Sequence, residues 1–351
     1  MAENIPQHDA HHLVLGAGMI GCYLAACLVR ADQIVSIVAR PKIIDDLKRH
    51  FSISDYEGNA YQVSELPLML QEEELKALPK KADILWLTVK CLSLETAIAS
   101  IRQCITDKTI IICCQNGVAN HQVVQHAFPQ NQVIRAMVPF NVVTEKAGQF
   151  HRGSQGHLIL ERTEKVNSAI QWLARQIHSE HLPVDTTFDM TAMQWAKLQL
   201  NLGNAVCALA DIPVKQMLED SEYRRFIAKM MIELLKVTRK KKIKLPKIAN
   251  LPNTWIPSVL NLPDWLFKIV AQKMLAVDPK VRTSMWWDLQ AGRMTEVDFL
   301  NGKVVDTAQE MGITASANSL VLKLIKYAER GKGVSADEFY GIVERANLSK
   351  K

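Results

Sequence analysis

The sequence predicts an α/β domain with a doubly wound, mostly parallel sheet, followed by an all-α domain. In the first half of the chain, short apolar runs alternate with helical patterns, which is typical of βαβ units. A glycine-rich turn follows the first apolar run, and near residue 187 strand-like runs give way to long helical periodicity. With 351 residues the chain is long enough for two cores. The predicted domains are therefore 1–187 and 188–351.

The strands of the first domain are expected where apolar runs are rich in β-branched residues. These runs are residues 12–15, 34–39, 83–89, 109–114 and 133–138. Helical patterns between them cover 20–30, 94–103 and 119–127. Residues 148–151 and 157–160 suggest an antiparallel pair, and a helix at 166–178 with a strand at 182–185 would complete the domain.

The second domain consists of helical patterns alone. They cover residues 190–209, 222–242, 265–276, 284–310 and 319–331. A stretch with prolines at 246, 252, 257 and 263 separates two of these helices. Trp255 and Trp265 in this stretch are expected to pack into the core or between helices.

Composition excludes several classes of function. The 42 basic residues are nearly balanced by 36 acidic ones, with no basic stripe interleaved with aromatic residues, so nucleic acid is not expected as a partner. The basic run at 239–244 is interpreted as a solvated helix end. No apolar stretch approaches a membrane span, and residues 1–12 lack the apolar core of a secretory signal. The seven cysteines show no metal-ligand spacing, so no metal site and a reducing, cytoplasmic location are expected.

A GxGxxG motif follows the first predicted strand and opens a helix. Its residues are Gly16, Ala17, Gly18, Met19, Ile20 and Gly21. Gly16 permits the tight turn, Gly18 lets the backbone approach a pyrophosphate, and Gly21 lets the helix pack on the strand. The helix N-terminus then faces the phosphate charge. In its βαβ context the motif predicts a Rossmann-type dinucleotide site; the alternative is a glycine-rich turn that binds nothing.

The second predicted strand indicates which dinucleotide is bound. A site that prefers NAD usually carries an acidic residue near the end of this strand to accept hydrogen bonds from the ribose 2′-OH. Here the strand contains no acid and ends in Arg40. A guanidinium matches a 2′-phosphate in charge and geometry, so NADP is the expected cofactor. The alternative is an ordinary exposed arginine.

Two helical segments carry polar residues that are candidates for a site. On the predicted helix 190–209, Lys197, Asn201 and Asn204 lie at i, i+4 and i+7 and share one face. The stripe is either solvent-facing surface or part of a site. On the predicted helix 284–310, Ser284 and Glu296 would lie roughly 120° apart if the helix were unbroken. They can therefore face one small ligand only if the helix bends, near Gly292, or if the ligand spans both; the alternative is a polar helix face.

These motifs together resemble the ketopantoate reductase (2-dehydropantoate 2-reductase) family over nearly the whole chain. The resemblance also covers the strand end Thr88-Val89-Lys90 and the turn Gln115-Asn116-Gly117. The pair Lys197-x-x-x-Asn201 and the element from Thr295-Glu296-Val297-Asp298 to Asn301-Gly302 are its most specific parts in combination.

The resemblance implies a role for each candidate. Lys197 corresponds to the catalytic acid of the family, and Lys90 and Asn116 to contacts with the cofactor. Glu296 corresponds to an active-site glutamate, which either holds Lys197 or contacts the cofactor ribose. The expected substrate contacts are Asn116, Lys197, Asn201 and Ser284. These roles are chemically consistent, because a lysine ammonium can stabilise the charge that hydride transfer leaves on a carbonyl oxygen, and can deliver the proton.

Two features depart from the family pattern. Members often carry a second asparagine eight residues after the lysine, where this chain has Ala205, with Asn204 one position earlier. The segment between Lys197 and Ser284 is also longer than in compact members, enlarged by residues 251–266. Both departures affect the identity of the substrate more than the class of reaction.

The expected activity is reduction of a 2-oxo acid by NADPH, with conversion of ketopantoate to pantoate in pantothenate synthesis as the first candidate. A reductase of another branched 2-oxo acid is one alternative. A non-catalytic NADP-binding regulatory protein is another, although the presence of Lys90, Asn116, Lys197 and Glu296 together argues against it. The expected partner is a small 2-oxo acid, with no nucleic acid and no membrane; a homodimer is left open.

Overall fold

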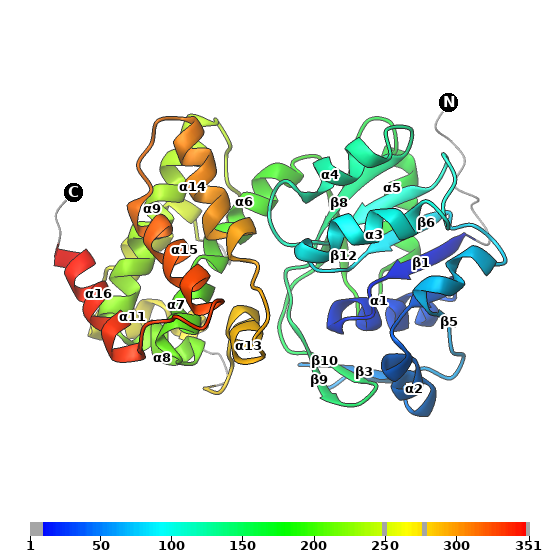
Figure 1. Ribbon diagram of the computed structural model, residues 1–351, viewed down its shortest axis with the longest axis horizontal. Helices are drawn as coiled ribbons and strands as arrows, with labels where there is room; N and C mark the ends of the chain where they lie inside the picture. Colours follow the sequence, from blue (N-terminus) through cyan, green and yellow to red (C-terminus); the bar gives the residue numbers. More distant parts are fainter. Residues whose placement is uncertain (1–9, 248–250, 276–278, 349–351) are drawn as a thin grey trace. The chain divides into compact units, whose positions relative to one another are not determined.

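The computed structural model describes residues 10–247, 251–275 and 279–348. The chain divides into two compact units, Met1–Met190 and Thr191–Lys351 (Figure 1). The first unit is α/β and the second is helical, which confirms the predicted fold class. In the described ranges, no helix is both long and apolar enough to cross a membrane.

The first unit is built on an eight-stranded sheet in the order β12-β11-β8-β7-β6-β1-β2-β5. The strands are β1 (His11–Leu15), β2 (Ile34–Val38), β5 (Leu68–Leu70), β6 (Ile84–Leu87), β7 (Ile110–Cys113), β8 (Gln132–Met137), β11 (Leu158–Glu161) and β12 (Val184–Thr187). The six strands from β5 to β8 are parallel, and β11 is antiparallel to β8. Strand order reverses between β1 and β6, and ligands of such sheets bind outside the carboxyl ends of the strands at this point.

Both faces of the large sheet are buried. Val14 and Trp86 belong to one apolar core, whereas Leu13 and Leu85 belong to a second core. Because successive side chains of a strand point to opposite faces, these strands read as continuous apolar runs in the sequence. The helices of this unit are α1 (Met19–Arg30), α2 (Pro41–Arg49), α3 (Leu94–Ile101), α4 (Asn120–Ala127) and α5 (Asn167–Ile177), with 3₁₀ turns η1 (Glu72–Ala77) and η2 (Cys91–Ser93).

A second, four-stranded sheet was not expected. Its order is β4-β3-β10-β9, with β4 (Ala60–Gln62), β3 (Ser52–Asp55), β10 (Gln149–Arg152) and β9 (Val142–Lys146). The predicted antiparallel pair of 148–151 and 157–160 is wrong, because β10 pairs with β3 and β9 while β11 pairs with β8 and β12. The guanidinium of Arg152, which is almost fully buried, donates to the carbonyl oxygens of Ser154 and Gly156. These bonds fold the connection back on Arg152, so the two strands enter different sheets.

The second unit is a set of helices around the long helix α9 (Ser221–Lys240), which packs against α10 (Ile256–Leu260), α14 (Asn301–Glu310) and α16 (Ala336–Leu348). The other helices are α6 (Met190–Asn201), α7 (Asn204–Ala210), α8 (Val214–Glu219), α11 (Asp264–Val270), α12 (Gln272–Leu275), α13 (Ser284–Gln290) and α15 (Ser316–Ala328), with 3₁₀ turns η3 (Asn253–Trp255) and η4 (Val297–Phe299). Residues 239–242 are exposed at the end of α9, as expected of a solvated helix end.

Several predictions for the second unit need correction. The predicted helix 190–209 is interrupted at residues 202–203, and the predicted helix 284–310 is replaced by α13, η4 and α14. Residue 276, in the predicted helix 265–276, lies outside the described residues. Trp255 and Trp265 are not core residues, with exposed fractions of 63% and 67%. Trp265 lies on α11, a short helix of seven residues that buries one face. Phe267 occupies that buried face, beneath the Arg224 guanidinium.

Candidate functional site

The glycine loop between β1 and α1 is shaped by contact with the end of β6. Gly16 has φ +116°, and a Cβ there would lie 2.6 Å from the backbone nitrogen of Val89. A Cβ on Gly21 would lie 2.0 Å from the carbonyl oxygen of Gly16. Both positions therefore require glycine for packing within the protein, independently of any ligand.

Gly18 is different, because the protein itself would tolerate a side chain there. Its backbone is extended, with φ −80° and ψ −174°, and a Cβ on it would meet no atom within 4 Å. Gly18 and Met19 are exposed, whereas Ala17 and Ile20 are partly buried and pack against the core. Gly18 thus faces open space beside the first turn of α1, where a helix has unpaired backbone N–H groups. This geometry suits the close approach of a pyrophosphate.

Side chains at the ends of β6 and β7 hold the glycine loop. The Thr88 hydroxyl donates to the carbonyl oxygen of Gly16 at 2.7 Å. The side-chain amide of Gln115 donates to the carbonyl oxygens of Leu87 and Val89 at 3.0 and 3.2 Å. The loops that follow β1, β6 and β7 are therefore cross-linked at the carboxyl edge of the sheet.

Lys90 and Asn116 are brought together at this edge. The Cys91 thiol donates to the carbonyl oxygen of Asn116 at 3.3 Å, and the Asn120 side chain donates to the same oxygen at 2.6 Å. Lys90, next to Cys91, is exposed, and Asn116 precedes Gly117, which has φ +90°. The sequence did not single out Cys91 or Asn120, because they join two loops: the Cys91–Asn116 and Asn120–Cys91 hydrogen bonds span 25 and 29 residues.

Arg40 lies at the same edge of the sheet as the glycine loop. Leu15 pairs with Val38 in the parallel register of β1 and β2, so Gly16 and Arg40 both follow the ends of neighbouring strands. Arg40 is exposed and precedes α2, whose first turn contains no acidic residue. An anionic group bound here would meet a guanidinium and no carboxylate from that turn.

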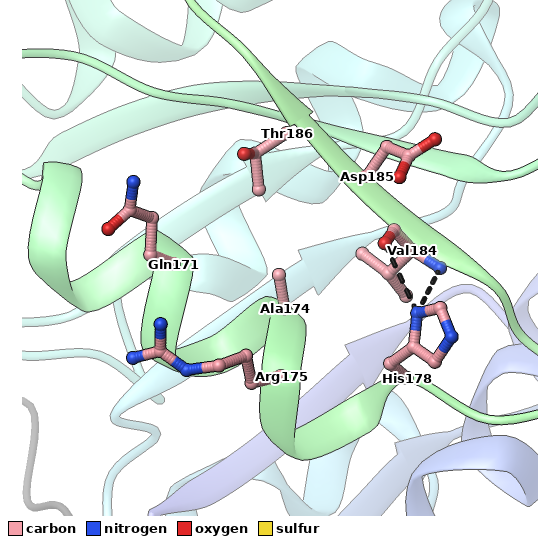
Figure 2. Close-up of a pocket in the computed structure, with 7 residues that line it drawn as sticks. All are labelled: Gln171, Ala174, Arg175, His178, Val184, Asp185 and Thr186. Carbon is pink, nitrogen blue, oxygen red and sulfur yellow. Dashed lines mark hydrogen bonds between the residues drawn. The ribbon is translucent and has the colours of Figure 1, made fainter.

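A surface hollow of about 340 Å³ lies elsewhere in this unit, between α5 and the edge strand β12 (Figure 2). Its lining includes Gln171, Arg175 and Thr186. His178 covers the strand edge here, because its Nδ1 accepts a hydrogen bond from the Val184 N–H at 3.1 Å. The hollow contains none of the predicted site residues and is five strands away from β1 in the sheet order, so it is not the dinucleotide site.

In the helical unit, Lys197 and Asn201 lie on α6, one turn apart and on one face. Both residues are half-buried, between buried neighbours such as Leu198 and Leu202. Asn204 begins α7, after the interruption, and is also half-buried, whereas Ala205 is fully buried. A side chain at position 205 would therefore point into the core.

Ser284 is brought close to Asn204 by its neighbour Thr283. The Thr283 hydroxyl donates to the carbonyl oxygen of Asn204 at 3.2 Å and caps α13 by accepting from the Trp286 N–H. Ser284 is the first residue of α13 and is exposed. The structure therefore gathers Ser284 and Asn204 at one place in the helical unit, although they are far apart in sequence.

Glu296 does not lie on the same helix as Ser284. Helix α13 ends at Gln290, and the chain turns at Gly292, which has φ +62°, where a bend was expected. Glu296 is half-buried and immediately precedes η4. It is flanked by Thr295 and Val297, which are both fully buried. The backbone on either side of Glu296 is therefore held inside the helical unit while its own side chain is partly exposed.

Both units match known families. The description "Ketopantoate reductase PanE/ApbA" applies to residues 12–165, and "Ketopantoate reductase PanE/ApbA C terminal" to residues 189–329. The chain belongs to the ketopantoate reductase family. This family consists of pyridine-nucleotide-dependent reductases, which confirms the expected oxidoreductase class.

Relatives and solved structures of this family cover almost the whole chain. The 2-dehydropantoate 2-reductase of Archaeoglobus fulgidus is 22% identical over 331 residues, which are 91% of this chain and 97% of the relative. That of Aquifex aeolicus is 22% identical over 321 residues, 90% of this chain and 96% of the relative. A PanE/ApbA family ketopantoate reductase from Ralstonia eutropha has a TM-score of 0.76 at 23% identity and covers 92% of this chain and 99% of its own. D-Mandelate dehydrogenase in complex with NADH and anilino(oxo)acetate also has a TM-score of 0.76, at 18% identity, covering 92% and 100%.

Proposed function

We propose that this ketopantoate reductase family member reduces a 2-oxo acid with NADPH, and that conversion of ketopantoate to pantoate, for pantothenate synthesis, is its reaction. The observation that carries the proposal is the open position at Gly18 beside the strand-order reversal, in a chain that matches the family over both units. The relatives named 2-dehydropantoate 2-reductase support the same substrate.

The residues of the first unit fit a dinucleotide. Gly18 leaves room for the pyrophosphate, with the N-terminal turn of α1 beside it. Arg40, with no acid in the following turn, would bind the 2′-phosphate and so favour NADPH over NADH. Lys90 and Asn116, joined by Cys91 and Asn120, would contact the rest of the cofactor, with Asn116 also contacting the substrate. When bound, the reduced nicotinamide supplies the hydride that adds to the carbonyl carbon.

The residues of the helical unit fit a small polar anion with a carbonyl group. The Lys197 ammonium would stabilise the negative charge that develops on the carbonyl oxygen and would donate a proton to it. Asn201 and Ser284 would orient the substrate by neutral hydrogen bonds. Glu296 would hold Lys197 in place by charge, or contact the cofactor ribose. Each of these groups is at least partly exposed, as a ligand contact requires.

A spectrophotometric assay of NADPH oxidation against a panel of 2-oxo acids tests the proposal. The panel contains ketopantoate, ketoisovalerate, which lacks its hydroxymethyl group, and phenylglyoxylate, the oxo acid related to mandelate. We expect the highest kcat/KM for ketopantoate with NADPH. Faster turnover of ketoisovalerate or phenylglyoxylate would assign another 2-oxo acid. Tight NADPH binding without turnover of any acid would instead indicate a non-catalytic NADP-binding protein.

A further inference from the structure

Glu296 lies in a part of the helical unit that has little regular structure of its own. Between α13 and α14 the chain forms only a turn and the short 3₁₀ segment η4. Its backbone hydrogen bonds, from the N–H groups of Phe299 and Leu300 to the carbonyl oxygen of Glu296, fix only one turn. The place of that turn in the unit therefore also depends on contacts with other elements. The residues that make those contacts then determine where the Glu296 carboxylate is held.

Helix α15 and the residue after it supply these contacts. The Glu329 side chain, only 1% exposed, accepts hydrogen bonds from both the backbone N–H and the hydroxyl of Thr295, each at 2.8 Å. The Thr295 hydroxyl oxygen in turn accepts a hydrogen bond from the Val297 N–H at 3.2 Å. Glu296 is therefore bracketed by two residues that are connected to one buried carboxylate.

Lys326 holds the same segment from its other end. Its ammonium lies 2.7 Å from a carboxylate oxygen of Asp298 and 3.2 Å from the second oxygen of Glu329. Burial alone would lower the pKa of Lys326, but its hydrogen bond to Asp298 and its ion pair with Glu329 raise that pKa above the usual range, so the side chain is charged at neutral pH. Lys326 thus joins the end of the segment to the carboxylate that holds its beginning.

The Glu329 carboxylate would be costly to bury without these partners. An unpaired carboxylate in the interior costs several kcal/mol, so both oxygens need donors or a cation. The partners described for Glu329 are Thr295, within the segment, and Lys326, which also holds the segment. The segment and the carboxylate are therefore matched to each other, and a change in one should displace the other.

We propose that Glu329 and Lys326 are positioning residues that hold the Glu296 carboxylate in its reactive place. The inference rests on the proposed function for the role of Glu296. Neither residue needs to touch substrate or cofactor, since Glu329 acts through Thr295 and Lys326 acts through Asp298.

The first test combines kinetics with cofactor binding in Glu329→Ala and Lys326→Met. A displacement of a reacting group by about 1 Å can cost roughly a hundredfold in rate. We expect Glu329→Ala to lower kcat for the best 2-oxo acid tenfold to a hundredfold, and Lys326→Met to lower it less. If Glu296 holds Lys197, the Kd for NADPH should stay within about twofold, because the glycine loop belongs to the other unit. If Glu296 contacts the cofactor ribose, the Kd should rise together with the loss of kcat. Glu329→Gln keeps an acceptor for Thr295 and should recover much of the lost rate.

Matched controls separate positioning from a general loss of stability. Glu338→Gln alters another carboxylate that accepts a backbone N–H in this unit, on α16, where the donor is Ser335. Lys323→Met removes a cation from the exposed side of the same helix. Both controls should keep the wild-type kcat. If Glu329 acts through Glu296, then Glu329→Ala should cost far less in a Glu296→Gln background than in the wild type.

Amide hydrogen exchange provides a readout that does not depend on activity. In Glu329→Ala the amides of Thr295 and Val297 should exchange at least tenfold faster, with helix α9 unchanged. Unchanged exchange in a folded Glu329→Ala protein overturns the inference, whether or not the wild type turns over any 2-oxo acid. Full additivity of the Glu329 and Glu296 substitutions also overturns it. An inactive wild type with the expected exchange pattern would instead reject the proposed function alone.

Discussion

Replacing Gly18 by valine separates ligand binding from folding more cleanly than any other change in the glycine loop. Its dihedral angles are allowed for every residue type, and an added Cβ meets no protein atom within 4 Å. The substitution should therefore leave the protein folded. Because it also restricts the unfolded chain, it should stabilise the fold by a few tenths of a kcal/mol, up to about 1 kcal/mol.

The loss in cofactor affinity follows from the same open space. If the pyrophosphate occupies it, the valine side chain prevents two charge-assisted backbone hydrogen bonds, each contributing about 1.5–3 kcal/mol. The Kd for NADPH should then rise by at least about a hundredfold. Gly21→Ala is the contrasting variant, because its Cβ would lie 2.0 Å from the Gly16 carbonyl oxygen, and it should lower the Tm markedly.

Titration calorimetry, with thermal unfolding followed in parallel, measures both effects. Gly341→Ala, on α16 of the other unit, controls for glycine replacement as such. A Gly18→Val protein that binds NADPH within threefold of the wild-type Kd would show that the loop is only a turn. A large fall in its Tm would show that the open space at Gly18 does not exist in solution.

Three further predictions concern charge. Arg40→Ala should weaken NADPH binding tenfold or more while changing NADH binding little, and equal losses in parallel titrations would reject a 2′-phosphate contact. Lys197→Ala should lower kcat by two or more orders of magnitude with little change in NADPH affinity. Combining it with Glu296→Ala should lower kcat by less than the sum of the two single effects. A near-normal kcat in Lys197→Ala would refute the mechanism. Burial, with a smaller contribution from a neighbouring histidine, lowers the pKa of His12 to about 3, so the unfolded chain takes up a proton that the folded one does not. The free energy of unfolding should therefore fall by about 1.4 kcal/mol per pH unit as pH falls from about 6.5 towards 3. His12→Gln keeps an acceptor for Trp86, and denaturant unfolding of this variant should show a shallower dependence of stability on pH. An unchanged pH dependence would contradict this origin.

Most of the large sheet was predictable because its signal is local; of its eight strands, the edge strand β5 (Leu68–Leu70) was not expected. Buried parallel strands are continuous apolar runs, and those containing Val14, Ile37, Trp86 and Ile112 are all present close to their expected bounds. The small sheet was missed because its strands are three to five residues long and largely polar on one side. Short polar strands owe their stability to pairing with distant segments, which no local pattern reveals.

The helical unit shows the same limit in another form. The apolar periodicity of residues 190–209 gives no sign of the interruption between α6 and α7. Gly203 keeps helix-like dihedral angles there, so the two helices follow one another with little change in the pattern. For the candidate site, glycines and strand-end residues could be named from the sequence. Residues that act by touching a distant loop, such as Cys91, Asn120 and Glu329, could not, because their partners are known only once the chain is folded.

The four-stranded sheet also affects how the first unit can form during synthesis. Its central pair joins β3 and β10, and the Ser54–His151 hydrogen bond between them spans 97 residues. While the ribosome is still translating the segment between them, β3 has only the short β4 beside it. The β3–β4 hairpin should therefore be open to proteases in nascent chains until β10 emerges, and the first half of the unit should fold poorly when expressed alone.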